Sequence, residues 1–167
     1  MKVKTIKVLP IILFGNFAMA AGFQSSQMSV ADMGYAYAGS ASSIGDTSVV
    51  YSNPAGMVFR EQDSAQASLY SLKSSVDFTN NGSSKAAAAG GAAISGPNAD
   101  GGTNNIIPNL YVHKKYNGFN LGLSVNAPFG SSTEYDRDWV GRYNAIESEL
   151  KVPNIGLSIA KKINDKF

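Results

Sequence analysis

The stretch PNLYVHKKYNGFNLGLSVNA, residues 108–127, decides the expected fold. Its second half alternates strictly, with apolar side chains at Phe119, Leu121, Leu123, Val125 and Ala127 and polar or small ones at Asn120, Gly122, Ser124 and Asn126. Its first half alternates in the same way, with Leu110 and Val112 opposite Asn109, Tyr111, His113 and Lys115. Asn117-Gly118 between the two halves is the strongest short hairpin signal. The stretch therefore predicts two antiparallel strands joined by a tight turn.

One apolar face and one polar face fit two kinds of sheet. An ordinary half-buried strand turns its apolar face to a protein core, whereas a strand of a membrane barrel turns it to lipid and its polar face to a wet lumen. The hairpin alone does not separate these interpretations.

Two further strands flank the hairpin. Residues 64–76 alternate weakly, and residues 152–163 alternate strictly, with Ile155, Leu157 and Ile159 against Asn154, Gly156 and Ser158. We expect Pro128 and Gly130 to end the strand that begins at Phe119, before an excursion of about twenty residues.

The connections thus run long, short, long, short, which is the rhythm of an outer-membrane barrel with short periplasmic turns and long outer loops. The short turn would place Tyr116 and Phe119 in an interfacial aromatic girdle. The low-complexity segment 77–105 is one of the long connections, and its alternative interpretation is a linker between domains, with Ala86 to Ala89 in a short helix.

The amino terminus has the form of a secretory signal peptide over residues 1–20. Lys2, Lys4 and Lys7 precede a short apolar run, and Ala18-Met19-Ala20 is a small-x-small cleavage site. The apolar run is too short to span a bilayer as a helix, and the alternative is an uncleaved anchor. Removing the leader leaves 11 basic and 12 acidic residues of the original 14 and 12, a net charge of −1. This argues against nucleic-acid binding.

Residues 21–60 are rich in small residues and resemble neither a leader nor a strand. Gly34, Gly39 and Gly45 recur at intervals of five and six, and Asn53-Pro54 favours a turn. A segment this short cannot bury a core of its own, so it must pack inside or against another part of the protein.

Catalytic chemistry has little support in the sequence. The chain has no cysteine, and its only histidine, His113, falls on the polar face of a strand, where we expect a wet, lumen-facing residue. No nucleophile elbow or paired-carboxylate cleft is found. The acids of the 129–149 excursion are expected on a solvated surface, with a calcium site as an unsupported alternative. We therefore expect no enzyme, no cofactor and no metal.

Several motifs resemble the FadL-type family of outer-membrane transporters for long-chain fatty acids and aromatic hydrocarbons. They are Ala21-Gly22-Phe23-Gln24, Gly34-Tyr35-Ala36-Tyr37-Ala38-Gly39, Asn53-Pro54-Ala55, Thr133-Glu134-Tyr135-Asp136 and Asp138-Trp139-Val140-Gly141-Arg142-Tyr143. The resemblance runs in consistent order from Ala21 to Phe167.

The resemblance implies an all-β, 14-stranded transmembrane antiparallel barrel, of which this chain is an N-terminal fragment. Residues 21–60 would then form a hatch, or plug, inside the barrel, and residues 61–167 its first four strands. Asn53, Pro54 and Ala55 map to the hatch motif that faces a lateral gap, and Phe23 to the mobile amino-terminal segment near the ligand.

The expected function is uptake of long-chain fatty acids, or of aromatic hydrocarbons, through the outer membrane of a Gram-negative bacterium by plug-gated diffusion. The full-length protein is expected to be a monomeric barrel whose partners are the solute and outer-membrane lipid. Two alternatives stay open at this stage. One is an outer-membrane adhesive surface protein whose long loops bind a host or phage partner, and the other is a secreted soluble β-protein.

Overall fold

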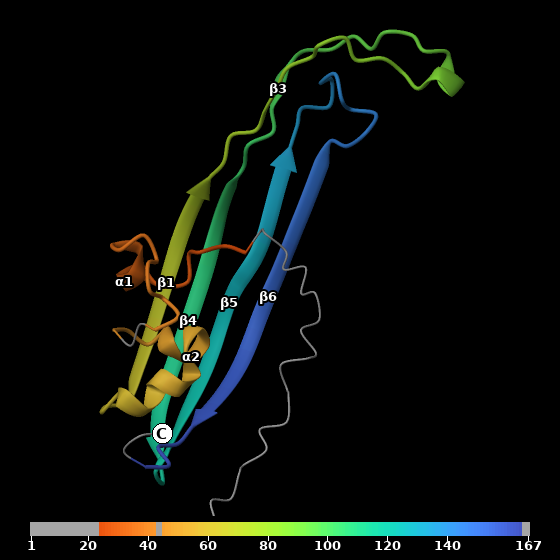
Figure 1. Cartoon of the computed structure of the whole chain (residues 1–167). Helices are drawn as coiled ribbons and strands as arrows, with labels where there is room; N and C mark the ends of the chain where they lie inside the picture. Colours follow the sequence, from red (N-terminus) through yellow and green to blue (C-terminus); the bar gives the residue numbers. More distant parts are fainter. Residues whose placement is uncertain (1–23, 43–44, 165–167) are drawn as a thin grey trace, which may run out of the picture.

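A computed structural model describes residues 24–42 and 45–164 (Figure 1). Its main element is a four-stranded antiparallel sheet in the order β1-β4-β5-β6. The strands are β1 Ser64–Lys73, β4 Asn104–Tyr116, β5 Phe119–Glu134 and β6 Glu147–Ala160. The four expected strands are thus confirmed, and each pairs with the next of the four along the chain. The signal peptide predicted for residues 1–20 lies outside the described residues.

The predicted hairpin is confirmed. Tyr116 pairs with Phe119 at its end, and the ladder continues to Leu110 opposite Val125. Asn117 and Gly118 have φ values of 49° and 79°, so both occupy the left-handed region that a two-residue hairpin turn requires. Asparagine and glycine tolerate this conformation better than other residues, which explains why the chain reverses here.

Three of the strands extend further than the alternation predicts. The prediction that Pro128 and Gly130 end the strand is wrong, because β5 continues to Glu134. The register between β5 and β6 shifts between Asn126 and Phe129 and then continues regularly to Glu134 opposite Glu147. A local irregularity therefore accommodates the proline, where the sequence pattern predicts an end.

The sheet has the reverse of the polarity usual in soluble proteins. Its apolar face is open, with Leu69, Ile106, Ile155 and Leu157 exposed by 75%, 73%, 74% and 85%. Its polar face is buried, and contains Asn109, His113, Asn120, Ser124 and Asn126 at 5% exposure or less. Such a sheet is stable only where the apolar face meets a non-aqueous surrounding, because exposing it to water forfeits about 25 cal/mol per Å².

The N-terminal segment, residues 24–60 without 43–44, covers the polar face (Figure 1). It contains α1 Val30–Met33, α2 Val49–Ser52 and the 3₁₀ helix η2 Pro54–Phe59. α2 contacts β4 and β5, and η2 contacts β5 and β6. No helix in the described ranges is long and apolar enough to cross a membrane.

A small core joins this segment to the sheet. Val49, Val50 and Met57 pack with Tyr111 of β4, all at 2% exposure or less. Gly122 of β5 makes the approach possible, since a Cβ there would lie 2.8 Å from Val50 Cβ and 2.9 Å from Met57 Sδ. The missing side chain of Gly122 thus leaves room for Val50 of α2 and Met57 of η2 to pack against the polar face.

The long connections pack together beyond the sheet. Residues 77–100 form a narrow excursion with the short pair β2 Asp77–Phe78 and β3 Ala99–Asp100, and the 3₁₀ helix η3 Ala87–Ala89 at its far part (Figure 1). Trp139 stacks on Tyr135 at 4.0 Å and meets Phe78 edge-on at 5.3 Å between ring centroids. The chain leaves this excursion to enter β4, which pairs with β1. The excursion is therefore a loop between two neighbouring strands of one sheet and not a linker between domains.

Candidate functional site

The N-terminal part of the chain makes hydrogen bonds with some polar groups of the face that it covers. Asn109 Nδ2 donates to the backbone oxygen of Gln27 at 2.9 Å. His113 is 1% exposed, and its ring nitrogens lie 3.1 Å from the oxygen of Gln62 and 3.0 Å from Asn120 Oδ1. The prediction of a wet His113 is therefore wrong: the residue faces inward as expected, but protein atoms enclose it. Both ring nitrogens are engaged in structural contacts.

Asp46 is the centre of a second polar contact. Its carboxylate accepts hydrogen bonds from Ser29 Oγ, from the backbone and hydroxyl of Ser48, and from Gln66 Nε2 of β1 at 2.9 Å. The carbonyl of the same Gln66 side chain accepts from the Thr47 backbone at 2.9 Å. Burial by itself would raise the pKa of Asp46, but the hydrogen bonds from Ser48, Ser29 and Gln66 together hold that pKa below its usual value. The segment is thus attached to β1 by an ionised carboxylate.

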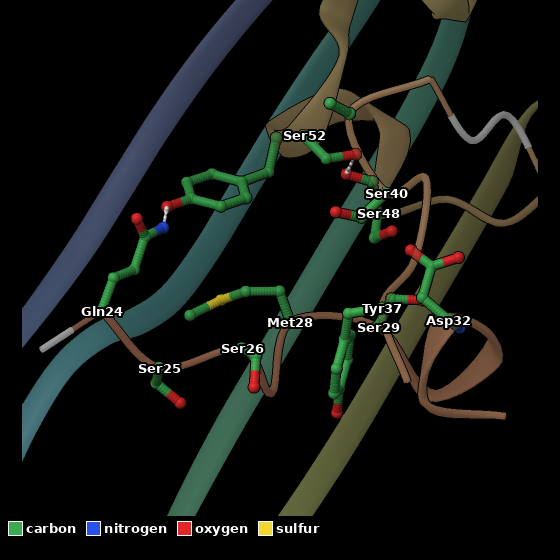
Figure 2. Close-up of a pocket in the computed structure, with 12 residues that line it drawn as sticks. Gln24, Ser25, Ser26, Met28, Ser29, Asp32, Tyr37, Ser40, Ser48 and Ser52 are labelled. Carbon is green, nitrogen blue, oxygen red and sulfur yellow. Dashed lines mark hydrogen bonds between the residues drawn. The ribbon is translucent and has the colours of Figure 1, made fainter. Parts of the chain in front are cut away.

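A pocket of about 610 Å³ lies within this segment (Figure 2). Its lining comes from residues 24–41 and from 48–52, and includes Met28, Asp32, Tyr37 and several serines. Gln24 Nε2 donates to Tyr51 Oη across it at 3.3 Å.

The irregularity between β5 and β6 has a clear cause in two prolines. Asn126 pairs with Asn154 and Phe129 with Val152, so Ala127 and Pro128 together oppose the single residue Pro153. Neither proline has an N–H to give to the ladder. The interruption is the signature of a β-bulge, which also turns the following side chains of β5 to the other face.

Gln24 and Ser25 form backbone hydrogen bonds with β5 at this bulge. Gln24 forms an antiparallel bridge with Phe129, and the Ser25 N–H donates to the Pro128 carbonyl at 2.7 Å. The N-terminal segment therefore supplies a backbone partner where β6 supplies none. The signal for this contact in the sequence is the pair Pro128 and Pro153, of which Pro128 by itself predicts the end of a strand.

Next to the bulge the inner face changes from polar to apolar. Side chains alternate along strands, so Leu72 and Ile107 point to the same inner face as Asn109. Beyond the register shift, β5 and β6 add apolar side chains to this face. A cavity of about 570 Å³ is lined by Ser25 and Gln27 of the N-terminal segment and by five apolar residues of the sheet: Leu72, Ile107, Phe129, Leu150 and Val152. The size and apolar lining are typical of a small-molecule pocket.

The residues predicted to form the gate are Asn53, Pro54, Ala55 and Phe23. Asn53 ends α2 and directly precedes η2, with its N–H bonded to Val49 and its carbonyl to Gly56. Pro54 is partly buried and Ala55 is exposed. Phe23 lies outside the described residues. The structure keeps Asn53, Pro54 and Ala55 together in one turn but places Gln24 and Ser25, not that turn, at the bulge.

These features define a class of protein: an antiparallel β-sheet protein whose apolar outer face suits a membrane and whose polar inner face is covered. The sequence profile of the outer membrane protein transport protein family (OMPP1/FadL/TodX) matches residues 11–167. The chain belongs to this family, which is one of transport proteins, as the sequence motifs predict. It is therefore an outer-membrane protein of a Gram-negative bacterium, and the soluble alternative does not hold.

Individual relatives agree with this assignment. The chain is 28% identical over 165 residues to outer membrane protein P1 of Haemophilus influenzae, covering 93% of this chain and 36% of that protein. It is 25% identical over 170 residues to the long-chain fatty acid transport protein of Escherichia coli O6:H1, covering 98% and 35%. The crystal structure of a Pseudomonas aeruginosa FadL homologue superimposes with a TM-score of 0.73 at 24% identity, covering 87% of this chain and 35% of that one. The chain thus spans about a third of these relatives. None of this favours the adhesive alternative.

Proposed function

We propose that this chain is the N-terminal part of an outer-membrane channel for hydrophobic compounds, with long-chain fatty acids as the favoured solute. The observation that carries the proposal is the apolar cavity of about 570 Å³ between the N-terminal segment and the inner face of the sheet. Transfer of an acyl chain into such a cavity is favourable by about 0.8 kcal/mol per buried CH₂. The relative named a long-chain fatty acid transport protein supports the choice of solute.

The proposal includes the architecture of the whole protein. Residues 1–20 are a signal peptide, residues 21–60 a hatch inside the barrel, and residues 61–167 the first four strands of a monomeric 14-stranded barrel. The sheet supports this with its apolar outer face and its covered polar inner face. Closure by further strands removes the open edges that a bilayer does not tolerate.

The proposed gate is the contact between the hatch and the bulge. Gln24 and Ser25 hold the amino-terminal segment against Pro128 and Phe129, at the one place where β5 and β6 lose their regular pairing within the described residues. Release of this contact would open the sheet next to the apolar cavity. Phe23 directly precedes these residues in the sequence, and the Asn53-Pro54-Ala55 turn sets the position of η2 on β5 and β6.

Two tryptophan substitutions on opposite faces of the sheet test the cavity. Ile107→Trp fills the cavity from the inner face of β4, whereas Leu69→Trp adds bulk to the outer face of β1, where Leu69 is 75% exposed and does not line the cavity. In the full-length protein we expect Ile107→Trp to lower oleate uptake on the order of tenfold, equivalent to about 1.4 kcal/mol. Leu69→Trp should leave uptake unchanged.

The measurement is oleate uptake, and growth on oleate as the sole carbon source, in a host without its own transporter. Surface abundance and heat-modifiable gel mobility show that each variant reaches the membrane as a folded barrel. Equal uptake by the two variants would overturn the assignment of the cavity. No growth with the unaltered protein in the outer membrane would overturn fatty acids as the solute and direct the test to toluene.

A further inference from the structure

The apolar face of the sheet ends in a set of cations near the Asn117-Gly118 turn. On β4, residues 110, 112, 114 and 116 share the outer face by alternation, so Lys114 and Tyr116 follow Leu110 and Val112 on that face. Lys161 directly follows β6, two residues after the outward Ile159. Both lysines are exposed, and both are at the short-turn edge of the sheet.

The geometry of Lys161 confirms that it points to the outer face. Its Nζ lies 4.6 Å from the ring centroid of Phe119, a residue of the apolar face of β5. The exposed rings of Phe119 and Tyr116 pair across the hairpin. The edge therefore combines two aromatic rings with two ammonium groups, the residue types that anchor a protein at the boundary between acyl chains and headgroups.

The two cations are near enough to act together. Lys114 is opposite Leu121, and Leu121 is opposite Ile159, so two strand spacings separate Lys114 from β6. With strand spacings near 4.8 Å and a rise near 3.3 Å per residue, the two lysine backbones are about 12 Å apart. Extended side chains from both positions can meet at one phosphate group above Leu121.

The acids of the described residues form no ion pair with these two lysines. Within residues 24–42 and 45–164, neither Lys114 nor Lys161 makes an ion pair with a carboxylate. Asp63, the acid next to β4 at this edge, accepts instead from the backbone N–H of Lys115 at 2.8 Å. The contrast is Lys151 toward the other end of β6, which is paired with Glu149.

We infer that Lys114 and Lys161, with Phe119 and Tyr116, form a binding site for the phosphate of an anionic phospholipid in the periplasmic leaflet. Short turns of bacterial outer-membrane barrels lie on the periplasmic side, so this edge meets phospholipid headgroups. The acyl chains would lie over Leu121 and Ile159 while the ammonium groups reach up to the phosphate. The inference rests on the proposed barrel and its orientation but not on the identity of the transported solute.

Native mass spectrometry of the full-length protein, purified in detergent, tests this site. Phosphatidylglycerol and phosphatidylcholine with the same acyl chains are titrated separately, and the fraction of protein that retains one lipid is measured. We expect preferential retention of phosphatidylglycerol. Lys114→Gln with Lys161→Gln should weaken it by about thirtyfold, since a lysine near an anionic lipid surface contributes about fivefold.

Two further variants make the result specific. Lys115→Gln removes the same charge from the adjacent residue of β4 on the opposite face, and should retain phosphatidylglycerol as the unaltered protein does. Lys114→Arg with Lys161→Arg keeps both charges and should also retain it. Heat-modifiable mobility checks that every variant is folded.

Three outcomes would overturn the inference: equal retention of the two lipids by the unaltered protein, unchanged retention by the double glutamine variant, or an equal loss in Lys115→Gln. Oleate uptake is measured on the same proteins. Normal uptake with lost lipid retention separates this site from the transport proposal. No oleate uptake by the unaltered protein, with normal lipid retention, refutes the proposed transport of oleate alone.

Discussion

At the scale of single residues, the Asp46 carboxylate connects the N-terminal segment to the sheet. It accepts from Ser29 and Ser48 within the segment and from Gln66 on β1. Hydrogen bonds to a charged group make a net contribution to stability of about 1.5–3 kcal/mol each. The residue is therefore expected to control how firmly the segment is held.

We predict that this attachment depends on pH. Because the folded pKa of Asp46 is lowered, its stabilisation is fully present above the unfolded value of about 3.9 and is lost as pH falls through the folded pKa. Hydrogen exchange at residues 46–52 of the full-length protein should accelerate below about pH 4, after correction for the intrinsic rate. Asp46→Asn should show faster exchange at neutral pH, with little further change on acidification. A pH response in Asp46→Asn equal to that of the unaltered protein would rule out this carboxylate as the source.

At the scale of elements, two short helices and a tight turn hold the N-terminal segment on the sheet. Pro54 begins η2, where its fixed φ suits a helical first turn and its missing N–H leaves no bond unmade. Asn53 ends α2 just before it. The turn thus determines how Val50 of α2 and Met57 of η2 enter the space above Gly122.

Loosening this turn should impair transport more than folding. Asn53→Ala together with Pro54→Ala gives the turn more conformational freedom, and we expect several-fold lower oleate uptake with a barrel that still resists heat in detergent. Tyr35→Ala is the control, since Tyr35 belongs to the same segment and is 75% exposed. Unchanged uptake by the double variant at equal surface abundance would remove the turn from the gating mechanism.

At the scale of the whole molecule, the sheet is inverted and open. Its apolar face is uncovered, and β1 and β6 each have a sheet partner on one side only within the described residues. Unpaired backbone groups cost several kcal/mol each in a bilayer, so four strands alone do not make a stable membrane protein.

We therefore expect residues 21–167 to fold only as part of the longer protein. Refolded alone into detergent, this segment should lack heat-modifiable mobility and be degraded by trypsin, whereas the full-length protein should show the mobility shift and resist the protease. A compact, protease-resistant state of residues 21–167 alone would show that the four strands and the N-terminal segment suffice.

The sequence itself determined the strands, the hairpin and the polarity of the sheet. These follow from local rules: a period of two places Leu121, Leu123 and Val125 on one face, and Asn117-Gly118 adopts the left-handed turn without help from distant residues. The family, too, was identifiable from short motifs in consistent order.

Only the tertiary structure decided the surroundings of Pro128, His113 and Gln24. Pro128 lies in a β-bulge instead of ending the strand, because β5 and β6 pair regularly again beyond it. Gln24 and Ser25 bond to the backbone of β5 at this bulge. His113 is buried because the chain near Gln62, about fifty residues earlier, covers it. The apolar cavity likewise exists only because the bulge turns Phe129 inward toward Leu72 and Ile107. These outcomes depend on contacts between residues far apart in the chain, which local patterns do not contain.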